Sequence, residues 1–566
     1  MTVSPTEEIP QDWVNVSSHL TEMAKAHPRR RAVVMPAGRD RSNRVCYSHL
    51  TFSQLDRAAD RIAHGFSEVG IGRGVRTILM VRPSLDFFAL TFALFKTGAI
   101  PVMVDPGMGI GRMLSCLAES RPEGFIGIPK AHVLRSIRPR FFRTVHTWVT
   151  VGRRWFWGGY TLSELMDRQW KPYPAAPTAR DETAAILFTT GSTGPAKGVV
   201  YTHGVFDAQI HAIRERFGIE PGEIDLPTFP LFALFAPALG MTAVIPDMDP
   251  TRPAKVDPVK IIEAVENQGV TNMFASPALL HRVGAFGKRK GIRLPSVRRV
   301  ISAGAPTLPS NVAQFSRLLT GEAQVHSGYG ATEAMPVSSI GSLEILSDTG
   351  KLSETGRGTC VGSPLPGMAV RIIGITDDPI PEWSENLCLA DGEIGEIAVK
   401  GPVVTRGYFD RPRDDALSKI RQGTAAWHRM GDVGWQDEKG RIWFCGRKGH
   451  RVTTVHGTLF TIPCEAIFNR HPAVFRSALV GVGPFGRQTP VICIEVKKHR
   501  TTKNRDALRS ELLDLARKSP LTETIETLLF HPAFPVDIRH NSKIFREKLA
   551  VWAGKRLKMP KVPEMS

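Results

Sequence analysis

The chain has 566 residues, 42% of them hydrophobic, and a formal net charge of +19. This length is too great for one hydrophobic core, so we expect two or more domains of an ordinary soluble globular protein. The basic residues are scattered, with local clusters at residues 135–154 and 288–299 and no aromatic-and-basic repeat. These basic residues are best explained as a solvated surface, and a site for acidic partners or anionic lipid is the second interpretation. Charge alone is weak support for nucleic-acid binding.

The cysteines indicate a reducing compartment. Seven of them are spread from Cys46 to Cys493, and no Cys-x-x-Cys pair occurs. An odd number without such pairs favours neither a disulfide framework nor a zinc site, so we expect a cytoplasmic protein. Residues 1–12 are acidic and polar, which is not typical of a signal peptide.

Helical and apolar β-like segments alternate along the first half of the chain. The predicted elements are a helix from residues 51–56 onward with Thr51 or Ser53 as its cap, a strand at 76–81, a helix at 84–97, a strand at 99–104 and a later strand at 300–303. Such alternation predicts an α/β fold with largely parallel sheets.

Residues 184–203 form the most informative stretch. An apolar run at 184–188 and a β-rich run at 199–202 flank a segment of small hydroxyl and glycine residues that contains Lys197. Glycines expose backbone N–H groups and a lysine adds positive charge, so the stretch predicts a phosphate-binding loop between two strands. It is not the common P-loop, because Gly198 follows Lys197 and the chain continues as a strand. An ordinary Gly/Ser/Thr linker is the alternative.

Residues 229–246 carry no charge, but three prolines and a glycine interrupt them, so a membrane-spanning helix is not expected. Two interpretations remain open, a core segment with turns and the wall of an apolar substrate tunnel. The predicted tunnel residues are Phe229, Phe232, Ala233 and Gly240.

The C-terminal half predicts two smaller units. Short β-like runs at residues 369–373 and 396–400 lie within a Gly- and Pro-rich region, 357–410, that indicates a small β subdomain. A large domain is predicted over residues 1–446 and a small α+β domain over 447–566, with a hinge at Gly449 and His450. The small domain is expected to hold a helix near 505–518 and strands near 478–482 and 491–496.

Three further stretches carry candidate chemistry. In residues 327–333, Tyr329 could stack on a base and Glu333 could hold Mg²⁺, although a glycine-rich turn explains the same residues. Asp432 suits a ribose diol, or it is a turn residue. Lys543 lies in a basic run that, taken alone, reads as solvated charge.

In this order and spacing, the four stretches resemble the adenylate-forming superfamily, which includes acyl-CoA synthetases, luciferases and peptide-synthetase adenylation domains. Supporting stretches lie at residues 302–306, 392–397 and 405–408, and the resemblance covers nearly the whole chain. It implies ATP, Mg²⁺ and a carboxylic acid as reactants, with acyl-AMP and pyrophosphate as products.

The motif matches imply roles for individual residues. The implied nucleotide-binding residues are Thr189, Thr190, Gly191, Ser192, Thr193, Gly194, Gly304, Ala305, Gly328, Tyr329, Gly330, Thr332, Asp432 and Arg447. Lys197 would hold phosphates and Glu333 the metal ion. Lys543 would stabilise charge on the α-phosphate and the attacking carboxylate, since both reacting groups are anionic.

Some segments depart from the superfamily pattern. Ala233 follows Phe232 where an aromatic-His pair is common, Gly449-His450 replaces the usual Asp or Lys of the hinge, and threonines occupy 453–454. These regions serve the second half-reaction in family members, so the departures argue against a standard CoA thiolation step. Residues 231–252, 453–464 and 531–540 resemble the β-lactone synthetases of bacterial long-chain olefin biosynthesis.

That subgroup implies a long-chain 2-alkyl-3-hydroxy acid that is activated and then closed to a β-lactone, in company with other enzymes of the olefin pathway. His203, His428 and His456 are candidate general bases by residue type.

The alternative enzyme is a long-chain fatty acyl-CoA or acyl-carrier ligase. A non-catalytic nucleotide-binding scaffold would be expected to have lost Lys197, Glu333 or Lys543. No nucleic-acid partner is expected, and membrane association would be peripheral at most.

Overall fold

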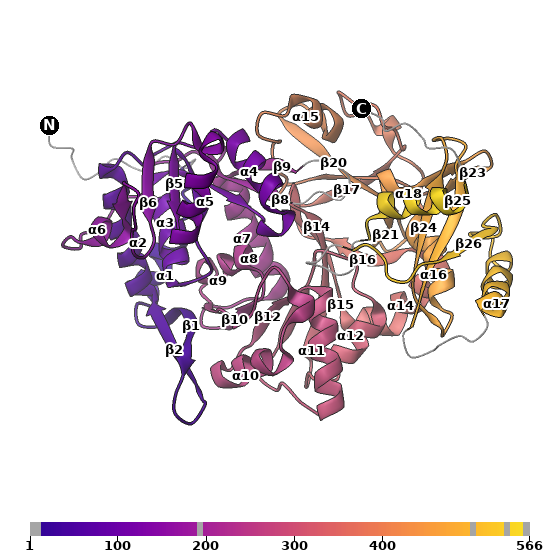
Figure 1. Ribbon diagram of the computed structural model, residues 1–566, viewed down its shortest axis with the longest axis horizontal. Helices are drawn as coiled ribbons and strands as arrows, with labels where there is room; N and C mark the ends of the chain where they lie inside the picture. The colour runs from indigo at the N-terminus through magenta and orange to yellow at the C-terminus, as the bar shows by residue number, and fades with distance from the viewer. Residues whose placement is uncertain (1–12, 190–195, 498–504, 537–543, 559–566) are drawn as a thin grey trace.

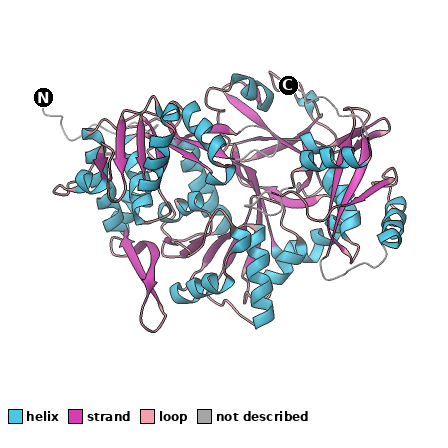
Figure 2. Cartoon of the chain, in the orientation of Figure 1, coloured by secondary structure: helices cyan, strands magenta, loops and turns pink. Residues whose placement is uncertain are grey.

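A computed structural model describes residues 13–189, 196–497, 505–536 and 544–558. The chain passes from a mostly parallel sheet at the indigo end, through a long second sheet, to a small third sheet at the yellow end (Figure 1). Helices lie on both sides of the strands through the N-terminal half (Figure 2). This α/β architecture confirms the predicted fold class.

The first sheet has the strand order β7-β6-β5-β3-β4-β8-β9. All neighbouring strands in it are parallel except β8 and β9, which form an antiparallel pair. The strands are β3 (Arg76–Met80), β4 (Ile100–Val104), β5 (Gly124–Gly127), β6 (Thr147–Thr150), β7 (Tyr160–Thr161), β8 (Thr183–Thr189) and β9 (Lys197–Thr202). The helices of this region are α1 (Ser18–Ala26), α2 (Phe52–Glu68), α3 (Leu85–Thr97), α4 (Ile110–Glu119), α5 (Pro129–Ile137) and α6 (Leu162–Met166).

Local capping explains where α2 and α3 begin. The Thr51 hydroxyl accepts a hydrogen bond from the Gln54 N–H, and the Gln54 side chain accepts one from the Thr51 N–H. This reciprocal box satisfies two N–H groups that a helix start leaves without partners. Ser84 caps α3 by accepting from the Phe87 N–H. The sequence prediction of both helices is confirmed.

The second sheet follows the order β17-β18-β20-β21-β16-β15-β14-β13-β12-β10-β11-β1-β2, with β19 paired to β20. From β14 to β11 and on to β1 the strands are parallel, and from β14 to β17 they are antiparallel. Its parallel part consists of β1 (Arg31–Arg39), β10 (Ile224–Pro227), β11 (Thr242–Val244), β12 (Asn272–Ala275), β13 (Arg299–Ser302) and β14 (Gln324–Ala331), and β2 (Val45–Thr51) pairs with β1 in the antiparallel sense.

The antiparallel part contains the predicted β subdomain. Its strands are β15 (Ala334–Gly341), β16 (Thr359–Pro364), β17 (Ala369–Ile373), β18 (Gly395–Lys400), β19 (Lys419–Gln422), β20 (Ala425–Gln436) and β21 (Ile442–Arg447). The short runs predicted at 369–373 and 396–400 are therefore strands, and β15–β16 pairing joins them to the central sheet. The helices of the second sheet are α7 (His203–Phe217), α8 (Pro230–Ala233), α9 (Phe235–Ala238), α10 (Pro258–Gln268), α11 (Pro277–Lys290), α12 (Pro309–Ser316), α13 (Ser342–Glu344), α14 (Gly350–Leu352) and α15 (Pro412–Ser418).

The C-terminal part has its own sheet and its own core. β24 (Val474–Val482) pairs antiparallel with β25 (Thr489–Val496), which pairs parallel with β26 (Thr527–Phe530). The remaining elements are β22 (Val452–Thr454), β23 (Gly457–Leu459), α16 (Thr461–Asn469), α17 (Arg505–Arg517) and α18 (Arg546–Arg556). Phe468, Ile492 and Leu512 are among the fully buried residues of a separate apolar cluster, as expected for a small α+β unit.

No helix in the described part of the chain combines the length and the apolar character that crossing a membrane requires. Residues 229–246, the least charged candidate, instead form α8, α9 and β11.

Candidate active site

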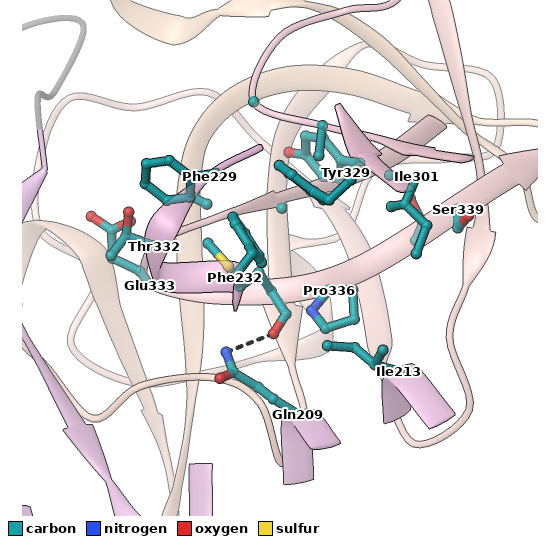
Figure 3. Close-up of a pocket in the computed structure, with 18 of the residues that line it drawn as sticks. Gln209, Ile213, Phe229, Phe232, Ile301, Tyr329, Thr332, Glu333, Pro336 and Ser339 are labelled. Atoms are coloured by element: carbon teal, nitrogen blue, oxygen red, sulfur yellow. Dashed lines mark hydrogen bonds between the residues drawn. The ribbon is translucent and has the colours of Figure 1, made fainter. Parts of the chain in front are cut away.

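A cavity of about 490 Å³ lies where α7 meets the central strands of the second sheet. Figure 3 shows Thr332 and Glu333 at one side of it, Tyr329 and Ile301 at the other, and Phe232 between them. Gln209 on α7 donates through Nε2 to the Met335 backbone oxygen at 2.9 Å, which ties the helix to the strand that follows Glu333. The cavity therefore has a polar end near Glu333 and a long side along α7.

Lys197 begins β9 and faces this cavity. Its ammonium Nζ lies 2.6 Å from Oδ1 of Asp414 on α15 and 4.9 Å from the centre of the Tyr408 ring. The register of the antiparallel pair sets Thr189, at the end of β8, opposite Lys197 at the start of β9. Lys197 therefore brings a positive charge to this part of the cavity wall, where Asp414 pairs with it.

Glu333 is held by the segment that precedes α15. Tyr408 donates its hydroxyl hydrogen to Glu333 Oε1 at 2.6 Å, and the Thr405 hydroxyl donates to the Glu333 backbone oxygen at 3.0 Å. Burial, and then the neighbouring Glu333 charge, raise the pKa of Tyr408 above its ordinary value, so the hydroxyl stays protonated and remains a donor. The carboxylate is thereby fixed in orientation at the cavity wall.

A second lysine lies behind this carboxylate. Lys419 is buried and donates to the Thr405 backbone oxygen. Burial lowers the pKa of Lys419 to about 8, although the negative charges of Glu333 and Asp415 act to raise it. His428 is paired with Lys419 in the strand register and lines the cavity. Burial, and then the Lys419 charge, hold the pKa of His428 well below its ordinary value, so its imidazole is neutral.

Tyr329 spans the other side of the cavity. Its hydroxyl donates to Asp432 Oδ2 at 2.8 Å, and Arg447 lies 3.1 Å from Asp432 Oδ1. The Asp432 charge raises the pKa of Arg447, so the pair is ionic. Gly304 also lines the cavity, at φ 93°, a backbone conformation that favours glycine.

The side of the cavity along α7 is apolar. Ile213 and Phe217 come from α7, and Phe232, Phe235, Leu239 and Met241 come from the α8–β11 region. The rings of Phe232 and Phe274 stack with their centres 4.3 Å apart. An apolar arm of this kind offers a surface on which a hydrocarbon chain could be buried.

Residues 20–409 match the model of the AMP-binding enzyme family. This chain belongs to that family. It is 49% identical over 551 residues to the olefin beta-lactone synthetase of Stenotrophomonas maltophilia, which covers 96% of this chain and 98% of that protein. The corresponding protein of Xanthomonas campestris pv. campestris is 47% identical over 549 residues, covering 96% and 98%.

The fold agrees with that family. The amide bond synthetase McbA from Marinactinospora thermotolerans superposes with a TM-score of 0.77 at 21% identity, covering 95% of this chain and 99% of McbA. At that identity the likeness concerns the fold. Together, the family match and the full-length relatives make this AMP-binding protein an adenylate-forming enzyme of the AMP-forming ligase type.

Most of the predicted site residues of this AMP-binding enzyme that the structure describes converge on one cavity. Those that line it are Lys197, Phe229, Phe232, Gly304, Gly328, Tyr329, Gly330, Thr332, Glu333 and Arg447. Asp432 is buried behind Tyr329, and Ala305 follows the lining residue Gly304 without lining the cavity itself. Thr189 is described as part of β8, whereas Thr190, Gly191, Ser192, Thr193, Gly194 and Lys543 lie outside the described residues.

Two of the predicted tunnel residues, Ala233 and Gly240, do not line this cavity. Ala233 is buried in the hydrophobic core. A Cβ on Gly240 would meet Met23 Sδ and Pro221 at 2.9 Å, so this glycine faces α1 and the preceding turn. Residues 229–246 therefore lie partly in the core, while Phe235, Leu239 and Met241 among them line the cavity.

The three candidate histidines of this enzyme lie in different places. His203 is buried and its Nδ1 accepts a hydrogen bond from the Val16 N–H, away from the cavity. His456 lies in the exposed turn between β22 and β23. Of the three, His428 lines the cavity.

The predicted hinge residues form a short 3-10 turn, Lys448–His450. Lys448 contacts Glu396 at 3.1 Å and the Thr376 backbone oxygen at 2.9 Å, both in the large sheet region. His450 contacts Glu547 of α18 at 3.0 Å, in the C-terminal part. Gly449 thus stands between a residue held by the large sheet and a residue held by α18.

Sequence reasoning missed Asp414, Tyr408 and Lys419. Tyr408 belongs to a stretch, residues 405–408, that had been matched to the superfamily without a role for its side chain. Asp414 and Lys419 lie in a charged segment whose sequence carries no signal for a site, and tertiary packing alone brings them beside Lys197 and Glu333.

Proposed function

We propose that this enzyme activates a long-chain 2-alkyl-3-hydroxy acid with ATP to give acyl-AMP and pyrophosphate, and then closes the acyl-AMP to a β-lactone with release of AMP. The observation that carries this proposal is the cavity, in which Lys197 and Glu333 stand at the end of an apolar arm. The substrate and the ring closure are supported by the near full-length relatives that are named olefin beta-lactone synthetases.

The first step joins two anions, a carboxylate and a triphosphate, so their repulsion must be offset. Lys197 supplies a cation at the cavity wall, and we assign Lys543 the same task at the reacting α-phosphate. Thr332 is assigned to the α-phosphate, and Tyr329 with Gly304 to the base. The Asp432–Arg447 pair is assigned to the ribose, which requires Tyr329 to release Asp432 when nucleotide enters.

Glu333 fits the magnesium role. Within the described residues, no group of three or more His, Cys, Asp or Glu side chains is arranged to hold a metal ion. Mg²⁺ at nucleotide sites is held by one or two protein carboxylates together with phosphate oxygens. A single oriented carboxylate facing the cavity is what that arrangement needs, and Mg²⁺ would then supply charge stabilisation on the phosphates.

Ring closure needs a base for the 3-hydroxyl proton, and we assign it to His428. This histidine lines the cavity, it is neutral, and its Nδ1 has no hydrogen-bond partner among the described residues. The hydroxyl oxygen would form the ester bond to the acyl carbon as the bond to AMP breaks and the proton passes to the base. Tethering of the hydroxyl to the acid replaces a second substrate.

One experiment separates this function from that of an acyl-CoA or acyl-carrier ligase. The enzyme is incubated with ATP, Mg²⁺ and a 2-alkyl-3-hydroxy acid without any thiol, and the products are identified by mass. We expect AMP, pyrophosphate and β-lactone, and bound acyl-AMP when the acid lacks its hydroxyl. Absence of lactone together with rapid thioester formation on adding CoA would favour the ligase. His428→Gln should form acyl-AMP but little lactone, whereas the exposed control His456→Gln should form both.

We further propose that the C-terminal part, beyond Gly449, rotates between the two half-reactions, that the protein acts in the cytoplasm, and that it works alongside other enzymes of an olefin pathway. The separate core of the C-terminal part supports the first proposal, because a unit with its own core can move as a body. The pathway proposal has its support in the names of the relatives.

A further inference from the structure

Two polar side chains that line the cavity, Asp225 and Asn272, belong to a row of polar residues across the second sheet. In the sheet register, Asp225 on β10 lies opposite Asn272 on β12, Asn272 lies opposite Arg299 on β13, and Arg299 lies opposite Gln324 on β14. Residues in register on neighbouring parallel strands point to the same face of the sheet. Phe274 and Ile301, two residues further along their strands, share that face and line the cavity.

The arm is long enough for this row to matter. Gln209, Ile213 and Phe217 line it from α7 at four-residue intervals, which places them on one face of the helix. From Gln209 to Phe217 the helix rises by about 12 Å. The chain leaves α7 by a short turn and enters β10, so Asp225 lies at the Phe217 end, away from Glu333.

Asp225 and Asn272 are both almost fully buried, at 4% and 3% exposure, and both line the cavity. Asn272 Nδ2 donates to Asp225 Oδ1 at 2.5 Å, while Asn272 Oδ1 has no hydrogen-bond partner among the described residues. Beside them, Arg299 forms an ion pair with the buried Glu223, with Nη2 at 3.1 Å from Oε1. The strand pairing therefore leaves a buried acceptor without a donor, in a side chain that lines the cavity.

We propose that the Asp225–Asn272 pair is the floor that sets the longest alkyl chain the arm accepts. The inference rests on the proposed function, since it concerns the alkyl chain of the acid. A methyl group pressed against the pair would remove the small solvent contact that the Asp225 side chain keeps, and it would offer no donor to the buried, unsatisfied Asn272 Oδ1. Each methylene added before that point gains burial, worth about a fourfold increase in affinity.

The test measures ATP–pyrophosphate exchange with a homologous series of 2-alkyl-3-hydroxy acids, in which one alkyl branch is lengthened at a time. With the wild-type enzyme we expect efficiency to rise about fourfold per methylene for one branch, and then to stop or fall at a limiting length. The variant Asp225→Val/Asn272→Val gives an apolar floor of similar size. It should raise efficiency at least about tenfold for acids longer than the wild-type limit and leave shorter acids unchanged.

Asp225→Asn is the matched control, because it keeps the shape and polarity of the floor and should keep the wild-type limit. An unchanged limit in the double valine variant, with normal efficiency for short acids, would overturn the proposal. If that variant does not fold, the proposal is tested on the wild-type enzyme by changing the end of the alkyl chain instead. For an alkyl chain just longer than the limit, replacing the terminal methyl group by a terminal hydroxyl should raise efficiency severalfold. Equal efficiencies for these two acids would overturn the proposal.

The readout also separates this inference from the proposed function. Exchange reports only acyl-AMP formation, so a chain-length limit that moves in the valine variant supports the floor even when no lactone is formed. Lactone formation with a limit that does not move would sustain the proposed function and refute the floor.

Discussion

Lys197 Nζ lies 2.6 Å from Asp414 Oδ1, so the lysine assigned to phosphate binding is already paired with a carboxylate of the same chain. Both side chains are partly exposed, which limits the strength of the pair to about 1 kcal/mol. On the proposed assignment, a triphosphate must break this pair to bind the lysine, so we expect Asp414 to compete with the nucleotide for Lys197.

Removing the competitor should tighten nucleotide binding. In Asp414→Asn we expect the Kd for ATP, measured by calorimetry, to fall by up to about fivefold, the equivalent of 1 kcal/mol. Asp410→Asn is the control, because Asp410 is paired with Arg121 and not with Lys197. A Kd that is unchanged or higher in Asp414→Asn would mean that Asp414 does not compete.

Tyr408→Phe should weaken the dependence on Mg²⁺. Without the 2.6 Å hydrogen bond from Tyr408, Glu333 loses the donor that orients it, and hydrogen bonds to charged groups contribute about 1.5–3 kcal/mol. We expect the Mg²⁺ concentration for half-maximal pyrophosphate exchange to rise at least about tenfold. Tyr173→Phe, which removes a remote hydroxyl hydrogen bonded to Ser67, should leave this concentration unchanged. The same Mg²⁺ dependence in both variants would exclude a positioning role for Tyr408.

Lys543→Ala should spare binding and slow adenylation. Loss of one charge stabiliser of the reacting phosphate costs about a hundredfold or more in rate, so pyrophosphate release should slow by at least that factor while the Kd for ATP changes little. Lys548→Ala on α18 is a nearby control, since Lys548 lies over the Phe545 ring. Near-normal pyrophosphate release from Lys543→Ala would remove Lys543 from the adenylation step.

Gly449→Pro should separate the two half-reactions. Proline fixes φ, and Gly449 stands between Lys448, which Glu396 holds, and His450, which Glu547 holds. We expect lactone formation from acyl-AMP, followed by rapid quench, to slow more than acyl-AMP formation. Gly449→Ala, which leaves φ free, should affect both steps little. Equal losses in both steps for the proline variant would argue against a hinge.

The stability of the protein should depend on pH through Asp225. Burial raises the pKa of Asp225 from 3.8 to about 7, so between these values the folded protein keeps a proton that the unfolded chain loses. The contribution of Asp225 to stability is therefore present at low pH and lost as pH rises through about 7, with a slope of at most about 1.4 kcal/mol per pH unit.

Asp225→Asn removes this titration. Urea unfolding of the wild-type protein and of the variant should give free energies that diverge as pH rises from about 4 to 7, with the variant gaining relative stability. His132→Gln, at another buried site, should not remove the fall in unfolding free energy between about pH 4 and pH 7. Burial lowers the pKa of His132 to about 4, so the contribution of His132 to stability rises with pH over this range. Parallel pH curves for the wild type and Asp225→Asn would show that Asp225 is ionised in the folded protein.

Elements that depend on neighbours in the sequence were predictable from it. The helix starts at Thr51 and Ser84 follow from side chains that cap the next turn, and the strands β8 and β9 follow from short apolar runs on either side of a glycine-rich loop. The ordered stretches around Lys197, Tyr329, Glu333 and Asp432 likewise predicted the family and part of the cavity wall, because each motif consists of a few adjacent residues.

Which residues meet across the cavity was decided by the tertiary structure. Asp414 reaches Lys197, and Asp225 faces Asn272, because strand order and register bring together segments that are far apart along the chain. Gly240 turns toward Met23 instead of the cavity for the same reason, since the packing of α1 determines which face of residues 229–246 is covered. Sequence patterns encode burial and local hydrogen bonding, whereas the partner of a buried charge depends on which strands become neighbours in the folded sheet.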